Sequence, residues 1–191
     1  MGKIVKTLKS DRTRARILTA AERLFAERGY ERTTIREISA LAEIDPAMVM
    51  RYFGNKECLF AKAAVFDLRL PDLRTMKRSR VGGALVEHFL EIWEGEAGGK
   101  GLVILLRAAA SNERAAETLR DILQTQILPT IRRISPGGLA PARAGLVASQ
   151  MLGLALSRYV LKLSPVANFS RTDVVRFVGP AIQHYILGEL E

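Results

Sequence analysis

Three positions between residues 34 and 56 can each begin a helix whose N-terminus binds phosphate. Thr34, Asp45 and Asn55 are residue types that cap the first turn of a helix. A helix N-terminus binds phosphate through its unpaired N–H groups and its dipole. Lys56 directly follows Asn55 and adds a positive charge at the last of these starts. The pattern predicts contact with a polyanion.

Residues 46–53 add side chains suited to the edges of DNA bases. Arg51 can pair with guanine O6 and N7, and a phosphate contact is the alternative. Met48 and Met50 should be exposed if Val49 faces inward. Exposed methionines can contact thymine methyl groups, although methionine also fills gaps in cores. This segment is therefore expected to be a helix that enters the major groove.

Polar residues also stand at the start of the preceding helix. Thr33 and Thr34 can donate to phosphate, and Thr34 with Glu37 has the spacing of a capping box. Capping and phosphate contact are compatible at Thr34. Arg36 should face outward and reach a base or the DNA backbone.

The elements that must position these side chains are short helices. Apolar residues recur at helical spacing over residues 13–28, and Gly29 fits a left-handed C-cap. Further helices start at the three capping positions, and the last is expected to run toward Leu68. The second and third helices are separated by residues 43–45, and Ile44 can fill the angle between them. This is helix-turn-helix geometry.

The positive charge is concentrated at the N-terminal end. The chain has 191 residues and a net charge of +9, of which residues 1–80 supply +8. A basic arm, residues 1–12, includes lysine or arginine at every third position from Lys3. The arm either enters a minor groove or is a disordered tail that adds non-specific attraction. For the charge alone, a solvated surface is the alternative to binding a polyanion.

The N-terminal motifs resemble the DNA-binding head of the tetracycline-repressor (TetR) family. The resemblance covers about residues 12–62 and rests on Gly29-Tyr30, Thr33-Thr34-Ile35-Arg36-Glu37-Ile38, Ala42-Glu43-Ile44-Asp45, Tyr52-Phe53-Gly54-Asn55-Lys56-Glu57 and Leu59-Phe60. It implies an all-helical dimeric regulator, usually a repressor that a small molecule releases from a palindromic operator. With the residue chemistry, it predicts DNA contacts by Thr33, Thr34, Arg36, Pro46, Ala47, Met48, Arg51, Tyr52 and Lys56.

The chain departs from the family pattern at Glu43, at Met50 and at Met48, where the family often has threonine. The family usually has glycine in the turn where this chain has Glu43, so we expect Glu43 to have a positive φ and some strain. The family commonly has a phosphate-contacting tyrosine where this chain has Met50, and Tyr52 can replace it. The operator sequence therefore cannot be transferred from relatives.

The rest of the chain is expected to be a helical body. We predict a head over residues 1–62 and an effector-binding and dimerisation domain over residues 63–191, with helices at 81–94, 102–111, 113–133, 142–163 and 172–189. The helix at 102–111 should be buried, so that Arg107 needs a carboxylate or a ligand as its partner. The expected effector pocket is mostly apolar and is lined by Phe66, Phe89, Trp93, Leu106, Arg107 and Leu123.

A ridge of small residues predicts a dimer interface in the helix at 142–163. Gly145, Ser149, Gly153 and Ser157 recur every four residues, which lets another helix approach closely. Gly inside a helix costs about 1 kcal/mol relative to Ala, so packing must compensate. The alternative is that the ridge packs within one subunit against the last helix.

Other function classes find little support. We find no Gly-rich phosphate loop, no pair of carboxylates and no cysteine or histidine spacing for a metal, so we expect no enzyme, metal or cofactor. His88 is near acidic residues, but an ordinary surface or packed histidine is the simpler interpretation. No apolar run reaches the roughly 18 residues of a membrane span, and we expect a cytoplasmic protein. The alternative to an effector-controlled repressor is a helix-turn-helix protein with a protein-partner or architectural role.

Overall fold

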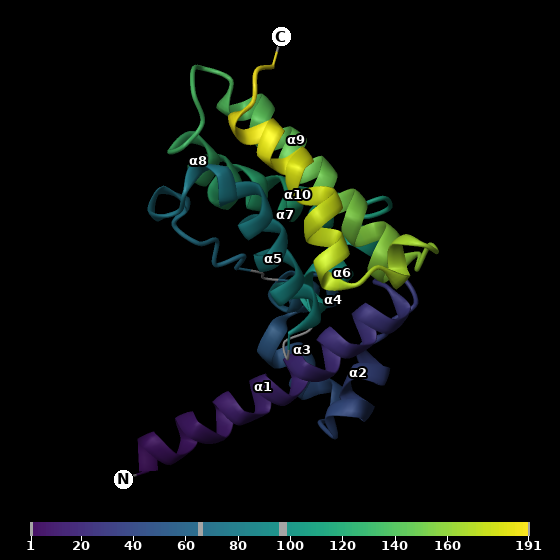
Figure 1. The fold of residues 1–191 in the computed structure, drawn as a ribbon. Coiled ribbons are helices and arrows are strands. Elements are labelled where there is room, and N and C mark those ends of the chain that lie inside the picture. Colours follow the sequence, from purple (N-terminus) through teal and green to yellow (C-terminus); the bar gives the residue numbers. More distant parts are fainter. Residues whose placement is uncertain (1, 65–66, 96–98, 191) are drawn as a thin grey trace. The chain divides into compact units, whose positions relative to one another are not determined.

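The computed structural model describes residues 2–64, 67–95 and 99–190, which contain helices and no β-strand (Figure 1). This confirms the predicted all-α fold. The α-helices are α1 (Gly2–Arg28), α2 (Ile35–Ala42), α3 (Pro46–Phe53), α4 (Lys56–Ala63), α5 (Val81–Glu94), α6 (Lys100–Ala108), α7 (Glu113–Ile122), α8 (Leu128–Arg132), α9 (Ala140–Ala155) and α10 (Arg171–Leu187).

The chain divides into two compact units. The first comprises residues 1–65 and 100–118, and the second comprises residues 66–99 and 119–191. The predicted division placed everything after residue 62 in the body. In the structure, α6 groups with the N-terminal helices because it packs against α1.

α1 begins earlier than the sequence pattern indicated. The amphipathic pattern starts at Thr13, whereas the helix starts at Gly2. The added residues contain no proline, and no glycine follows Gly2, so nothing in the segment breaks a helix. The backbone of the predicted flexible arm is therefore a continuation of α1.

An aromatic cluster closes the core of the first unit. Gly29 has the predicted positive φ, 78°, and ends α1. Tyr30 then folds back onto Phe25 and Phe60, with ring centroids 6.0 and 4.9 Å away. Phe25 and Phe60 are 0% and 2% exposed, so the start of α4 is fixed against the end of α1.

α4 ends earlier than predicted. The helix stops at Ala63, whereas the sequence suggested that it continues toward Leu68. The backbone of Leu68 is bonded elsewhere in the second unit. Its N–H donates to Gln126 Oε1 at 2.7 Å, and its carbonyl lies 2.8 Å from His88 Nε2. These bonds replace those that a longer α4 would make.

Glycines bring α5 and α10 into close contact in the second unit. A Cβ on Gly82 would clash with the Gly179 carbonyl and would lie 2.5 Å from the Gln183 backbone nitrogen. Gln183 also links the helices, because its Oε1 accepts from the Gly82 N–H at 2.8 Å. Its Nε2 donates to the Arg78 carbonyl at 2.8 Å. Glycine is therefore required at position 82, because the backbone of α10 lies too close to leave room for a side chain.

Proline and π-helical turns divide the predicted long helices. The predicted helix at 113–133 is interrupted by a π-helical turn, Leu123–Ile127, just before Pro129. Pro129 has no N–H to donate, and its ring crowds the preceding turn, so regular α-helix cannot continue there. A second π-helical turn, Leu156–Val160, follows α9. Pro180 lies inside α10, which stays one helix.

Arg143 connects α9 with the end of α10. Its side chain is 3% exposed, and its guanidinium donates to the carbonyls of Tyr185 and Gly188 at 2.9 and 2.8 Å. A positive charge at a helix C-terminus is favourable because carbonyl groups there lack partners within the helix. The second unit thus buries a charge against backbone carbonyls.

We predict that Gly82→Ala lowers the free energy of unfolding by about 2 kcal/mol or more, because the new methyl group forces α5 away from α10. Thermal or denaturant unfolding followed by circular dichroism measures this. Gly83→Ala is the matched control, since its Cβ would meet only Val175 Cγ1 at 3.7 Å.

The control should be neutral or stabilising by up to about 1 kcal/mol, as expected for Gly→Ala within a helix. Equal destabilisation by both substitutions would contradict the close crossing at Gly82.

Candidate nucleic-acid interface

The helix-turn-helix is built from two short helices with capped starts. Thr34 Oγ1 accepts from the Glu37 N–H at 3.2 Å, and Glu37 Oε2 accepts from the Thr34 N–H at 2.9 Å. This is the predicted capping box. Asp45 caps α3 by accepting from the Ala47 N–H at 2.7 Å, and Pro46 begins the helix. Asn55 caps α4 by accepting from the Cys58 N–H at 2.7 Å. All three predicted helix starts are confirmed.

The capping box also carries an ion pair to α1. Arg28 Nη1 lies 2.7 Å from Glu37 Oε1. The pKa of Glu37 is lowered mainly by the hydrogen bonds from Thr34, with a further contribution from Arg28. The carboxylate therefore stays ionised and holds the start of α2 against the end of α1.

The turn between α2 and α3 has the backbone conformation predicted at Glu43. Its φ of 51° and ψ of 46° lie in the left-handed region. Arg16 holds this turn, because its Nη2 donates to the Ala42 carbonyl at 2.6 Å and to Glu43 Oε2 at 2.9 Å. Ile44 is half-buried beside it. A salt bridge from α1 thus accompanies a backbone conformation that costs a non-glycine residue about 1 kcal/mol.

α3 has one buried side and one exposed side. Val49 is fully buried, whereas Ala47, Met50 and Arg51 are exposed. Met50 is 42% exposed, and Met48 is half-buried. The exposed side carries no acidic residue. It therefore presents apolar groups and one guanidinium group, as the sequence predicted, except that Met48 is half-buried where exposure was expected.

Tyr52 lies between two arginines. Its ring is 5.5 Å from the guanidinium carbon of Arg14 and 5.6 Å from that of Arg51. Its pKa is lowered mainly by a hydrogen bond with Ser10, with a smaller contribution from Arg51. Arg14 was missing from the predicted contact residues. Arg14 lies within α1, and only its contact with Tyr52 of α3 distinguishes it from the neighbouring basic residues.

The predicted DNA contact by the Thr33 side chain is wrong. Its side chain is fully buried, and its hydroxyl bonds to the carbonyls of Gly29 and Leu24 at 2.8 and 3.2 Å. Leu24 lies near the end of α1, and Gly29 directly follows its last residue. Thr33 therefore completes α1 instead of facing DNA. Thr34 is exposed, but its hydroxyl donates to Glu37 Oε2 at 2.8 Å.

Arg36 and Lys56 flank these helix starts. Arg36 is exposed on α2. Lys56 lies in the first turn of α4 with its ammonium group 4.2 Å from the centre of the Tyr30 ring. The same group is 3.4 Å from the Glu31 carbonyl. These contacts orient the Lys56 charge, and its contact with phosphate stays a prediction.

The predicted effector residues are distributed over both units. Phe66 lies outside the described residues. Phe89 and Trp93 on α5 belong to the second unit, where Trp93 stacks on Tyr159 with centroids 4.8 Å apart. Leu123 is half-buried against the core of that unit. Leu106 is half-buried on α6 in the first unit.

Arg107 differs from its prediction. It is exposed, and its Nη1 donates to the carbonyls of Ala26 and Glu27 at the end of α1. Neither the expected carboxylate nor a ligand is needed to explain it, because a helix C-terminus attracts a positive charge. The rest of α6 is enclosed as expected, since every described position from Gly101 to Ala108 other than Arg107 is buried or half-buried.

The small-residue ridge of α9 faces away from its own unit. A Cβ on Gly145 or Gly153 would meet no atom within 4 Å, and Ser149 is exposed. This contradicts the alternative that the ridge packs against α10 within the subunit. Ser157 is half-buried in the π-helical turn after α9, which changes the helical register of the ridge.

Large apolar side chains surround this ridge on the surface. They are Leu146, Leu152 and Leu156, at 36–38% exposure. Phe177 on α10, the helix that packs against α9, is 51% exposed.

Two other kinds of feature are absent from the part of the chain that the structure describes. Within this part, no helix is long and apolar enough to cross a membrane. No group of three or more metal-binding side chains occurs there. Cys58 is exposed and unpaired.

Comparison with known proteins matches both parts of the chain. Residues 17–63 match the family of bacterial regulatory proteins named tetR. Residues 79–186, more than half of the chain, match the tetracyclin repressor-like C-terminal domain.

The chain belongs to the TetR family.

Individual relatives agree with this assignment. The HTH-type transcriptional repressor NicS of Pseudomonas putida is 43% identical over 56 residues, which are 29% of this chain and 26% of NicS. A TetR-family regulator from Streptomyces coelicolor is 29% identical, with a TM-score of 0.63 over 92% of this chain and 95% of that one. A regulator from Saccharomonospora viridis in complex with choline has a TM-score of 0.65 at 22% identity, over 90% and 95% of the two chains.

We predict that Glu43→Gly is neutral or stabilising in this TetR-family head. Glycine removes about 1 kcal/mol of left-handed strain, and the exposed ion pair to Arg16 contributes little. Glu43→Ala is the matched control, because it loses the same ion pair but keeps the strain. Thermal unfolding should place the glycine variant about 1 kcal/mol above the alanine variant. An alanine variant at least as stable as the glycine variant would contradict this.

Proposed function

We propose that the chain is a transcriptional repressor that binds a palindromic operator as a homodimer and is released by a small, mostly apolar effector. The observation that carries the DNA-binding part is the exposed side of α3. It offers Ala47, Met50 and Arg51 next to Tyr52 and Arg14, and α3 itself has no acidic residue. Family membership and the +8 charge of residues 1–80 support the same conclusion.

The side chains of the head divide into two proposed roles. Arg51 reads guanine in the major groove, while Ala47, the half-buried Met48 and the exposed Met50 contact thymine methyl groups. Arg36, Lys56 and the capped helix starts bind phosphate, and phosphate contacts fix the register without reading sequence. Pro46 and Thr34 lie exposed at two of these starts.

We predict that Arg51→Ala and Arg51→Lys both reduce affinity for a selected operator by roughly 5- to 150-fold, about 1–3 kcal/mol. Lysine keeps the charge but lacks the two-pronged hydrogen bond to guanine. Binding of labelled operator and of scrambled DNA, at one fixed salt concentration, measures both affinities.

Lys56→Ala is the comparison for this experiment, because it should weaken binding to both DNAs by the same factor. If Arg51→Lys binds the operator as tightly as the unchanged protein, Arg51 contacts phosphate and not a base.

The dimer interface is proposed on α9 and α10. Exposed leucines beside the ridge of Gly145, Ser149 and Gly153 form an apolar surface, and Phe177 is an exposed aromatic residue on α10, which packs against α9. Removing such apolar side chains from water favours association. A two-fold axis here would provide two heads for two operator half-sites, as a palindrome requires.

We predict that Gly153→Leu produces monomers. The new side chain meets open space within the subunit, so the fold should persist, but it would overfill a close helix pairing. Sedimentation measures the mass, and operator binding should fall by roughly 10²- to 10⁴-fold when two heads are no longer linked.

Gly138→Leu is the matched control, because this glycine also faces open space but lies in the loop before α9. It should remain dimeric. A stable Gly153→Leu dimer with unchanged operator affinity would place the interface elsewhere.

The effector part of the proposal rests on two arguments. Residues 79–186 match the C-terminal domain of a repressor family, and one fold neighbour is described in complex with choline. The test is the release of fluorescently labelled operator by small apolar compounds, with denaturation midpoints checking that each compound also binds the protein. If no compound binds, the chain is better described as a regulator controlled by a protein partner.

A further inference from the structure

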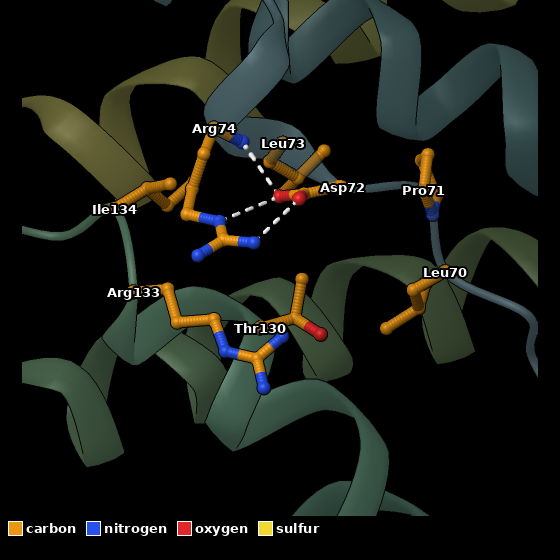
Figure 2. Close-up of a pocket in the computed structure, with 8 residues that line it drawn as sticks. All are labelled: Leu70, Pro71, Asp72, Leu73, Arg74, Thr130, Arg133 and Ile134. Atoms are coloured by element: carbon orange, nitrogen blue, oxygen red, sulfur yellow. Dashed lines mark hydrogen bonds and ion pairs between the residues drawn. The ribbon is translucent and has the colours of Figure 1, made fainter.

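A small pocket in the second unit lies between the segment that follows α4 and the end of α8. Figure 2 shows side chains from both segments around it. Its volume is about 120 Å³, and it is lined by Leu70, Pro71, Asp72, Leu73, Arg74, Thr130, Arg133 and Ile134. None of these residues belongs to the predicted DNA, effector or dimer sites.

One wall of the pocket carries a rigid arginine. Arg74 Nε and Nη2 donate to the two carboxylate oxygens of Asp72 at 2.9 and 2.6 Å (Figure 2). The backbone N–H of Arg74 donates to the same carboxylate at 3.1 Å. Both groups are therefore fixed, and Arg74 Nη1 makes no hydrogen bond to any described residue.

The Asp72 carboxylate is ionised under all ordinary conditions. Hydrogen bonds from Arg74 lower the pKa of Asp72 to about 2, and the charge of Arg133 contributes to the lowering. The negative charge of Asp72 and the positive charge of Arg74 cancel. The pocket therefore keeps a net positive charge, which comes from Arg133.

Arg133 supplies the opposite wall. Among the described residues, none makes a hydrogen bond or an ion pair with its guanidinium group. Figure 2 shows its side chain extending along the pocket below Arg74. Thr130 lies beside it and donates its hydroxyl hydrogen to the Gln126 carbonyl at 2.9 Å. The hydroxyl lone pairs remain available to a protonated oxygen of a ligand.

Size and charge together limit the ligand. Pockets for drug-sized molecules are about 300–1,000 Å³, and water occupies about 30 Å³ per molecule in the liquid. A volume of 120 Å³ therefore suits a group of about four or five heavy atoms. Guanidinium groups bind carboxylate and phosphate oxygens through paired N–H donors.

We propose that this pocket binds a small oxyanion, either phosphate or a short carboxylate, through Arg133 and the Nη1 group of Arg74. The anion compensates the charge of Arg133 and connects the segment before α5 to the end of α8. The proposal is independent of DNA binding and of the effector site.

The test is calorimetric titration of the full chain with inorganic phosphate and, separately, with acetate, against sodium chloride at equal ionic strength. At least one of the two anions should bind saturably. The anion that binds more tightly shows whether the pocket prefers phosphate or a carboxylate. Arg133→Met should weaken that binding about 10-fold or more, as expected for a charge-assisted hydrogen bond.

Arg132→Met is the matched control, since Arg132 is exposed, is adjacent in sequence and does not line the pocket. It should change the affinity less than about twofold, and circular dichroism should show both variants folded. Absence of saturable binding by either anion, or an equal loss in both variants, would overturn the proposal.

Discussion

The presentation of α3 depends on the turn that joins it to α2. At Glu43 the backbone must enter the left-handed region, which a non-glycine residue occupies at a cost of about 1 kcal/mol. Arg16 of α1 binds both the carbonyl that ends α2 and the Glu43 carboxylate. With Val49 buried below, the turn fixes which side of α3 faces outward. The identity of the exposed side chains follows from this one constraint.

The need to pair backbone carbonyls at helix ends explains several residues that have no role at the DNA surface. A helix end leaves carbonyl groups without partners. At the end of α1 these carbonyls bind the Thr33 hydroxyl and the Arg107 guanidinium, and at the end of α10 they bind Arg143. Polar side chains that are often assigned to ligand binding can thus donate hydrogen bonds to backbone carbonyls instead.

Local signals in the sequence predicted the head well. Capping at Thr34, Asp45 and Asn55, and the positive φ of Gly29 and Glu43, depend on residues within a few positions of each other. Thr33 and Arg107 were misassigned because their partners are backbone carbonyls at and just beyond the end of α1, and periodicity carries no information about which side chain bonds to them.

Contacts between residues far apart in the sequence also explain which features of the second unit could not be predicted. Leu68, which the sequence placed toward the end of α4, instead donates its N–H to Gln126 and lies with its carbonyl beside His88, and only the folded second unit brings these residues together. The role of Gly82 required the crossing of α5 with α10, whereas the exposed ridge of α9 could be predicted from its four-residue spacing.

The exposed side of α3 is proposed to read base sequence, with the two copies of α3 in a dimer binding the two half-sites of one operator. Selection of bound duplexes from a random library, with the unmodified full-length chain at physiological salt, tests it most directly. The account predicts enrichment of one sequence with two-fold symmetry, whose half-sites are separated by about one helical turn or a multiple of it. Enrichment of no sequence, or of a single unrepeated half-site, would contradict it.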